Sequence, residues 1–317
     1  MNYPIEGDFI ESKSGHIFEI KGFHQPKDKT IAFIRYAPTN KSPSLEIERR
    51  KRVNSSTCSL EYYKKIYPLN EKFQYIQENH PEYLFSHPNY YFQLQAVPNS
   101  EIKEHFLPNK FLQILHNSKE ILPSSSVLKD ALDLCIYFSE KSGISYEYIG
   151  ITGSLLVGLQ NEDSDIDLIV YGYENSIKIR KVIKENFQNQ DENHPLCAYS
   201  IKNYKDLYKS RAKGSSISFQ KFLQYEIRKI HQGKFRNRDF FIRFLEHSNR
   251  NKYKNENQFE NREIKSLGRI ELSGEVVNDE FWWITPSRVQ IANISIENSK
   301  KLLPDASDIL RRHSLKI

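Results

Sequence analysis

The stretch Ile151–Gly172, ITGSLLVGLQNEDSDIDLIVYG, decides the fold of the central part of the chain. Gly153 and Ser154 are followed by ten residues and then by the run DID, which contains Asp165 and Asp167. DIDLIVY is typical of a strand, and side chains that alternate along a strand place the two aspartates on one face. Adjacent carboxylates repel each other, and a hard divalent cation such as Mg²⁺ removes that repulsion. The pair therefore predicts a metal site.

The residues before Asp165 and Asp167 are typical of a phosphate-binding segment. Gly153 begins a turn into a short helical segment, GSLLVGL. Glycine lets the backbone approach a ligand closely, and N–H groups at the start of a helix attract anions. Ser154 has two compatible roles, a hydroxyl contact to a phosphate oxygen or a helix cap. We expect one element to hold a triphosphate and the next to hold the metal that bridges it, as nucleotidyl transfer requires.

Together, these motifs resemble the nucleotidyltransferase superfamily typified by DNA polymerase β, over about Val127–Leu245. The resemblance implies an α+β fold in which helices pack on a mixed, palm-like sheet. It also implies Mg²⁺ or Mn²⁺ held by Asp165 and Asp167, and a nucleoside triphosphate such as ATP seated by Gly153 and Ser154. An acceptor hydroxyl would attack the α-phosphorus. More loosely, the segments EGDFIESKSGHIFEIKG and SGEVVNDEFWWITPSRV resemble uncharacterised archaeal nucleotidyltransferase-domain proteins.

The family places a third acid on the next strand. Asp239 opens the strand-like segment Asn237–Leu245, and we favour it as the third metal ligand and catalytic residue. Glu246 and Glu271 are alternatives, and an ordinary ion pair of Asp239 with a neighbouring arginine stays open. Without a correctly placed third acid, no group in the family's scheme deprotonates the acceptor.

Composition excludes several classes of protein. With 317 residues, 38% of them hydrophobic, the chain is long enough for two domains, and 19 Tyr, 19 Phe and 2 Trp can build their cores. We find no apolar stretch of membrane-spanning length and no signal peptide in the opening MNYPIEGDFIE, so we expect a cytoplasmic protein without a membrane partner. Cys58, Cys135 and Cys197 follow no metal-ligand spacing and read as reduced thiols.

Positive charge is concentrated in one segment. The net charge is +6, while Ile201–Lys265 alone contains 17 Lys and Arg against 7 Asp and Glu. Aromatic residues lie among these cations, which favours an RNA acceptor, although the aromatics alternatively form a buried stripe with the lysines on its wet side. A Ser, Thr or Tyr of a protein is an alternative acceptor. A third interpretation is an inactive nucleotide- or RNA-binding module on the same fold.

We expect three parts: an N-terminal α/β segment (residues 1–122), a nucleotidyltransferase core with a basic helical insert (123–250), and a small C-terminal β unit with a tail (251–317). In the first part, the patterns predict strands and helices around a polar loop. The predicted strands are Ile17–Lys21 and Thr30–Arg35, the loop is Thr39–Ser56, and the helices are Glu61–Tyr67 and Leu69–Glu78.

The core shows the most regular periodicity. The predicted helices are Val127–Ser142, Ser176–Phe187 and one capped by Ser218, and the predicted strands are Tyr146–Thr152, Asp165–Tyr171 and Asn237–Leu245. In the C-terminal part we expect a hairpin of Leu267–Val277 and Phe281–Thr285. The second of these strands contains Trp282 and Trp283, of which one would face the core and the other a wetter site, such as one for a nucleobase.

Overall fold

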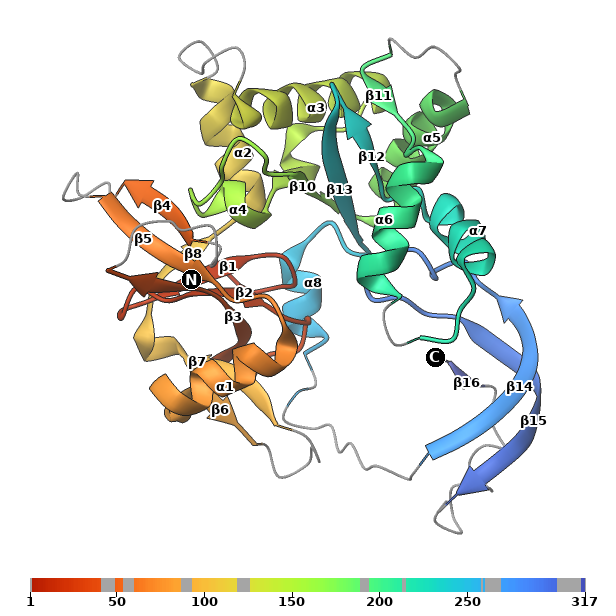
Figure 1. Cartoon of the computed structure of the whole chain (residues 1–317), viewed down its shortest axis with the longest axis horizontal. Helices are drawn as coiled ribbons and strands as arrows, with labels where there is room; N and C mark the ends of the chain where they lie inside the picture. The colour runs from red at the N-terminus through yellow and green to blue at the C-terminus, as the bar shows by residue number, and fades with distance from the viewer. Residues whose placement is uncertain are drawn as a thin grey trace.

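The chain folds into three sheets with helices packed on and between them, as a computed structural model shows (Figure 1). The structure describes residues 2–40, 49–53, 60–86, 93–118, 126–188, 194–212, 215–257, 259, 269–300 and 315–316. The expected α+β class is confirmed. Among the described helices, none has the length and apolar character needed to cross a membrane.

The N-terminal part is an eight-stranded sheet with strand order β4-β5-β3-β2-β1-β8, to which β6 and β7 are added through β3. Helix α1 (Leu69–Asn79) contacts β3 and confirms the second predicted helix. We call this sheet together with α1 the N-terminal unit. Its strands are β1 (Phe9–Ser12), β2 (Ile17–Ile20), β3 (Lys29–Thr39), β4 (Arg49–Val53), β5 (Leu60–Lys65), β6 (Leu84–Phe85), β7 (Leu94–Pro98) and β8 (Ile102–Phe106).

Both predicted strands of this unit are confirmed, but two other predictions are wrong. The segment predicted as the helix Glu61–Tyr67 is strand β5, which pairs with β3 and β4. Its aromatic residues favour a strand, and the partner strands that stabilise it are distant in sequence, so local spacing was misleading. The expected loop Thr39–Ser56 contains β4, while residues 41–48 and 54–56 lie outside the described part.

The second sheet is mixed, with strand order β11-β12-β13-β10-β9. Strands β10 and β13 run parallel and the other pairs antiparallel. Its strands are β9 (Ile149–Ile151), β10 (Ile166–Tyr171), β11 (Leu196–Cys197), β12 (Gln232–Phe235) and β13 (Arg238–Leu245). The three predicted core strands are therefore present, although the first begins later than expected because Tyr146–Tyr148 form a 3₁₀ turn.

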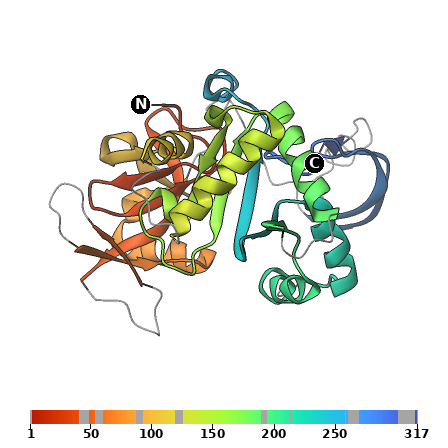
Figure 2. The same ribbon diagram turned by 90° about the horizontal axis from the view of Figure 1, so that it is seen from above.

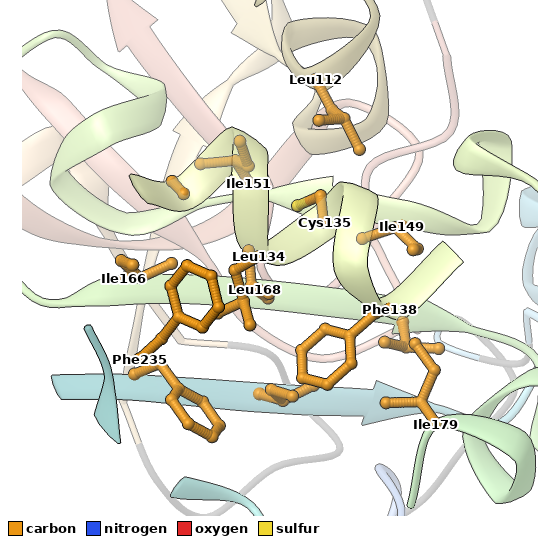
Figure 3. Packing of buried hydrophobic residues seen from close by; sticks show 14 of the residues in the cluster. Leu112, Leu134, Cys135, Phe138, Ile149, Ile151, Ile166, Leu168, Ile179 and Phe235 are labelled. Atoms are coloured by element: carbon orange, nitrogen blue, oxygen red, sulfur yellow. The ribbon is translucent and has the colours of Figure 1, made fainter. Parts of the chain in front are cut away.

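Two long helices cover one face of this sheet. Helix α3 (Val127–Ser142) has the predicted bounds, with Ser126 as N-cap and Gly143 in a left-handed C-cap. It lies across the sheet next to α5 (Tyr173–Gln188), as Figure 2 shows. Figure 3 shows Phe138 of α3 near Leu168 of β10 in the buried core that they share. Helix α2 (Pro108–Asn117) packs against β9 and contributes to the same core.

The opposite face of β10 meets the N-terminal unit. Ile169 and Tyr171 lie on this face and pack in one buried cluster with Ile5 and Phe23. A buried ionic group fixes the contact: Arg250 donates two hydrogen bonds to the fully buried Asp8, at 2.5 and 2.8 Å. A buried charge without its partner is costly, so separating Asp8 from Arg250 is unfavourable. The pair therefore holds the N-terminal unit against the sheet.

Helices α6 (Ile201–Arg211) and α7 (Phe219–Lys229) form the predicted insert, and Ser218 caps α7 by accepting a hydrogen bond from the Lys221 N–H. Helix α8 (Arg250–Asn255) follows β13. The insert lies across β10 and β13 from the N-terminal unit (Figure 1).

The C-terminal part contains a hairpin, but its second strand was predicted wrongly. Strand β14 (Arg269–Asn278) pairs with β15 (Gln290–Lys300), which pairs with β16 (Leu315–Lys316). Phe281–Thr285 instead forms turns that return to the second sheet, where the Thr285 N–H donates to Phe244 O at 2.8 Å. Its bulky apolar side chains find a buried partner there, which a two-stranded ribbon does not provide.

Candidate active site

Asp165 and Asp167 line one cavity of about 490 Å³. Asp167 lies in β10 and Asp165 just before it, so strand alternation turns both toward the face opposite the core. Asp165 is exposed and Asp167 half-buried. Burial raises the pKa of Asp167 to about 7, and the nearby carboxylates of Asp165 and Glu19 add to the shift. The pair therefore resists full ionisation and favours a bound cation, as a hard oxygen-ligand site does.

The loop before α4 (Gly153–Leu156) is packed directly against this pair. The Thr152 N–H donates to Asp167 O at 2.9 Å, and the Thr152 hydroxyl donates to Gly7 O at 2.6 Å. Gly153 has φ +68, and a Cβ there would lie 3.0 Å from Cγ of Asp167 and closer still to its Oδ2. Glycine is required for both reasons. Ser154 follows it and lines the same cavity.

The N-terminal unit supplies the facing wall of the cavity, which sequence reasoning missed. Arg35 of β3 and Lys65 of β5 line it, together with Tyr67. The Arg35 guanidinium lies 4.8 Å from the centre of the Tyr67 ring, and the Lys65 ammonium 5.7 Å. No local signal marks these residues, because only the pairing of β3 with β5, which sets Tyr36 opposite Lys65, brings them together.

The cations that line the cavity differ in whether they form ion pairs. Arg243 of β13 also lines the cavity, but it is ion-paired with Glu6 and with Glu19. Arg35, in contrast, makes no ion pair within the residues that the structure describes. It still contributes, with Arg243, to holding down the pKa of Asp167. Arg35 is thus a cation that faces the carboxylate pair and is available to an anionic ligand.

This geometry can be compared with known proteins. Residues 137–230 match the family model of the nucleotidyltransferase domain. This part of the chain is thus similar to nucleotidyltransferase domains. The resemblance to polymerase β-like nucleotidyltransferases is thereby confirmed, and it supports a transferase activity in general terms. The matched range contains the Gly153 loop and both aspartates, but neither β13 nor the N-terminal unit.

The similarity of the chain extends beyond this domain. An uncharacterized protein of Methanocaldococcus jannaschii, MJ1086, is 26% identical over 297 residues, which are 93% of this chain and 83% of that protein. The expected likeness to uncharacterised archaeal proteins is confirmed. No solved structure matches the chain.

Asp239, the favoured third acid, lies on the strand next to the pair. Ile166 is opposite Phe240 in the parallel register, which places Asp239 beside Asp165 on the same face of the second sheet. The two acids also line a shared cavity of about 390 Å³. Asp239 is exposed and ion-paired with Lys234 at 3.0 Å. Within the described residues, no three acids, histidines or cysteines are gathered closely enough to hold a metal.

The alternative third acids are engaged elsewhere. Glu246, at the far end of β13, accepts two hydrogen bonds from Arg288 at 2.7 and 2.8 Å, and these hold its pKa below the usual range. Glu271 lies on β14 opposite Asn298 and is exposed. None of the three candidates lines the cavity of the aspartate pair, but Asp239 shares the neighbouring cavity with Asp165, whereas Glu246 and Glu271 line neither. Asp239 therefore keeps the position of the third acid, and its role stays a prediction.

The basic insert, helices α6 and α7, is partly an ordinary amphipathic pair of helices. Tyr204 and Phe222 are buried between its elements, whereas Tyr225 is 52% exposed. Arg211, at the end of α6, reaches the cavity of the aspartate pair. The buried stripe, the alternative to an RNA-binding surface, thus accounts for most of the aromatic residues of the insert. Arg211 links the insert to the cavity of the aspartate pair.

Proposed function

We propose that the protein is a nucleotidyltransferase that uses Mg²⁺, or Mn²⁺, to transfer a nucleoside monophosphate from a nucleoside triphosphate to an acceptor hydroxyl, with RNA as the acceptor. One observation carries the proposal: the carboxylates of Asp165 and Asp167 line the same cavity as the Gly153–Ser154 loop of the nucleotidyltransferase domain. The neighbouring parallel strands β10 and β13 also suit the palm-like arrangement of the family.

The residues present fit a divalent cation. Two hard carboxylates, one of them disfavoured as a lone anion, leave room for phosphate and water oxygens to complete the coordination, as Mg²⁺ prefers. When bound, the cation would neutralise charge on the phosphates during transfer. Asp239, beside Asp165, would complete the ligand set and accept the proton of the acceptor hydroxyl.

The chain's own residues would orient the triphosphate. Gly153 keeps side-chain atoms away from the Asp167 carboxylate, so a phosphate can approach the backbone there. Ser154 offers a hydroxyl in the same cavity. Arg35 and Lys65, on the facing wall, would neutralise the β- and γ-phosphates and hold the pyrophosphate as it leaves.

Transfer from an NTP labelled at the α-phosphate tests the proposal. With total RNA and Mg²⁺, we expect label in a product that nuclease degrades and protease does not, and no label in EDTA. Label in a protease-sensitive product would replace RNA by a protein acceptor. Calorimetric binding of nucleotide without turnover, with all four triphosphates and either metal, would support the inactive binding module, which the lack of a three-acid cluster among the described residues favours.

The facing wall gives a separate prediction. Replacing Arg35 or Lys65 by alanine should lower kcat/KM for the nucleoside triphosphate about tenfold or more, because each removes a charged contact to phosphate. Lys64→Ala is the matched control, since Lys64 is the neighbour of Lys65 on β5 and does not line the cavity. Steady-state kinetics at saturating acceptor measure the effect. Equal losses in Lys64→Ala and Lys65→Ala would remove the wall from triphosphate binding.

A further inference from the structure

A second cavity, of about 330 Å³, lies beside the aspartate site and is not used by the proposed reaction. Strands β12 and β13, helix α7 and the turns after β14 form it. Phe241 and Arg211 line both cavities, so the two are adjacent. Phe241 is the residue opposite Asp167 in the β10–β13 register, and neighbouring strands are about 4.8 Å apart. The second cavity thus begins one strand away from the carboxylates.

The two tryptophans of the chain meet this cavity in different ways. Trp283 packs against the core, with its ring 5.6 Å from that of Phe244 and the Arg180 guanidinium 4.2 Å from its centre. Trp282 lies outside that core cluster and lines the cavity, with the Arg228 guanidinium 5.5 Å from its ring centre. The expectation of one core-facing and one wetter tryptophan agrees with this placement, although turns rather than a strand produce it.

His231 lines the cavity and has a side-chain nitrogen without a hydrogen-bond partner among the described residues. The Nε2 atom of His231 is buried and forms no hydrogen bond within the described part of the chain. Burial lowers the pKa of His231 to about 3, and the cations Arg180 and Lys229 add to this, so the imidazole is neutral. An unpaired buried nitrogen is costly unless a ligand satisfies it. The cavity thus combines the aromatic side chains of Phe241 and Trp282 with a polar lining that includes Glu226, Lys229 and Gln232, which suits a planar heterocycle with a polar edge.

The geometry of phosphoryl transfer indicates which reactant would reach the second cavity. In phosphoryl transfer, the attacking and leaving oxygens lie roughly in line across the phosphorus. The loop with Gly153 follows β9 on one side of the aspartate strand, where Arg35 and Lys65 would hold the pyrophosphate. Strand β13 and the second cavity lie on the other side, and Figure 1 shows the insert there. The acceptor must therefore enter from the side of the second cavity.

We infer that the cavity between Phe241 and Trp282 binds the terminal nucleobase of a nucleic-acid acceptor. This inference rests on the proposed function and adds the site that would distinguish an RNA end from a protein side chain. The base stacks on the Trp282 ring, and a donor on its edge satisfies Nε2 of His231. Arg211, which lines both cavities, contacts the adjoining phosphate.

A binding experiment tests the inference without any need for turnover. A fluorescently labelled short oligoribonucleotide is titrated with the full chain in EDTA, and its anisotropy is compared with that of an oligomer lacking only the 3′-terminal base. We expect the intact oligomer to bind about fivefold more tightly or better, as stacking of one base predicts. It should also quench the emission of Trp282 and Trp283, which are the 2 tryptophans of the sequence. The same result is expected in the variant with both Asp165→Asn and Asp167→Asn.

Variants then assign the effect to Trp282. Trp282→Ala should remove the preference for the intact terminus, Trp282→Phe should keep most of it, and Tyr225→Ala, at an exposed aromatic outside the cavity, should leave it unchanged. Equal binding of both oligomers by the parent chain would overturn the inference. So would loss of preference in Trp282→Phe equal to that in Trp282→Ala, or an effect of Trp282→Ala on the KM for the triphosphate instead. Label transfer that persists after any of these results shows that the proposed function survives without the base site.

Discussion

Replacing Asp165 and Asp167 together by asparagine is expected to lower nucleotidyl transfer by about a thousandfold or more. Asparagine keeps the shape of each side chain but removes the negative charge that holds a divalent cation, and such a cation contributes several kcal/mol to transfer. The α-label assay measures the loss. Lys64→Ala, away from the cavity, should retain full activity in parallel. Transfer at the parental rate in the double variant would exclude the pair from the mechanism.

The single variant Asp167→Asn should be more stable than the parent chain in EDTA. Because the pKa of Asp167 is raised to about 7 in the folded state, its ionisation opposes folding as the pH rises from the unfolded value of about 4 through 7. At pH 8 the variant should gain roughly 1–3 kcal/mol in unfolding free energy, and at pH 4 the gain should vanish. Urea unfolding at both pH values measures it. A gain that does not depend on pH would contradict this account.

Gly153→Ala is expected to cost both stability and activity. The left-handed backbone costs an alanine about 1–2 kcal/mol, and its Cβ would in addition press on the Asp167 carboxylate. We expect a loss of roughly 3 kcal/mol or more in unfolding free energy and a loss of transfer beyond what instability explains.

Gly143→Ala is the matched control for this variant. Gly143 has φ +70, close to the +68 of Gly153, but a Cβ there would have no neighbour within 4 Å. The difference between the two alanine variants therefore isolates the contact with Asp167. Equal stability of the two, with equal activity, would show that the contact is unimportant.

Local sequence was enough to predict the centre of the site. The spacing of Gly153 from Asp165 and Asp167, and the period of α3, depend on neighbours along the chain, so alternation and helical spacing predict them. The placement of all three residues at one cavity agrees with that reasoning. Their chemical roles stay predictions.

The rest depends on pairing between distant segments. Strand β5 was predicted as a helix because its partners, β3 and β4, cannot be inferred from its own six residues. For the same reason, Arg35 and Lys65 could not be recognised as cavity residues. The turn at Trp282 was misassigned because its contact with β13 is a long-range one, which replaces the expected hairpin pairing.

The docking of the N-terminal unit through Asp8 and Arg250 has a consequence for how such a protein can be divided. The recognised domain, residues 137–230, carries both carboxylates, yet the opposing cations come from residues 35 and 65. Excising residues 137–230 would keep Arg211 but remove Arg35 and Lys65, the cations to which the proposed function assigns the pyrophosphate. If the proposed function holds, the matched range is therefore not separable from the N-terminal unit, because residues of both parts of the chain line the same cavity.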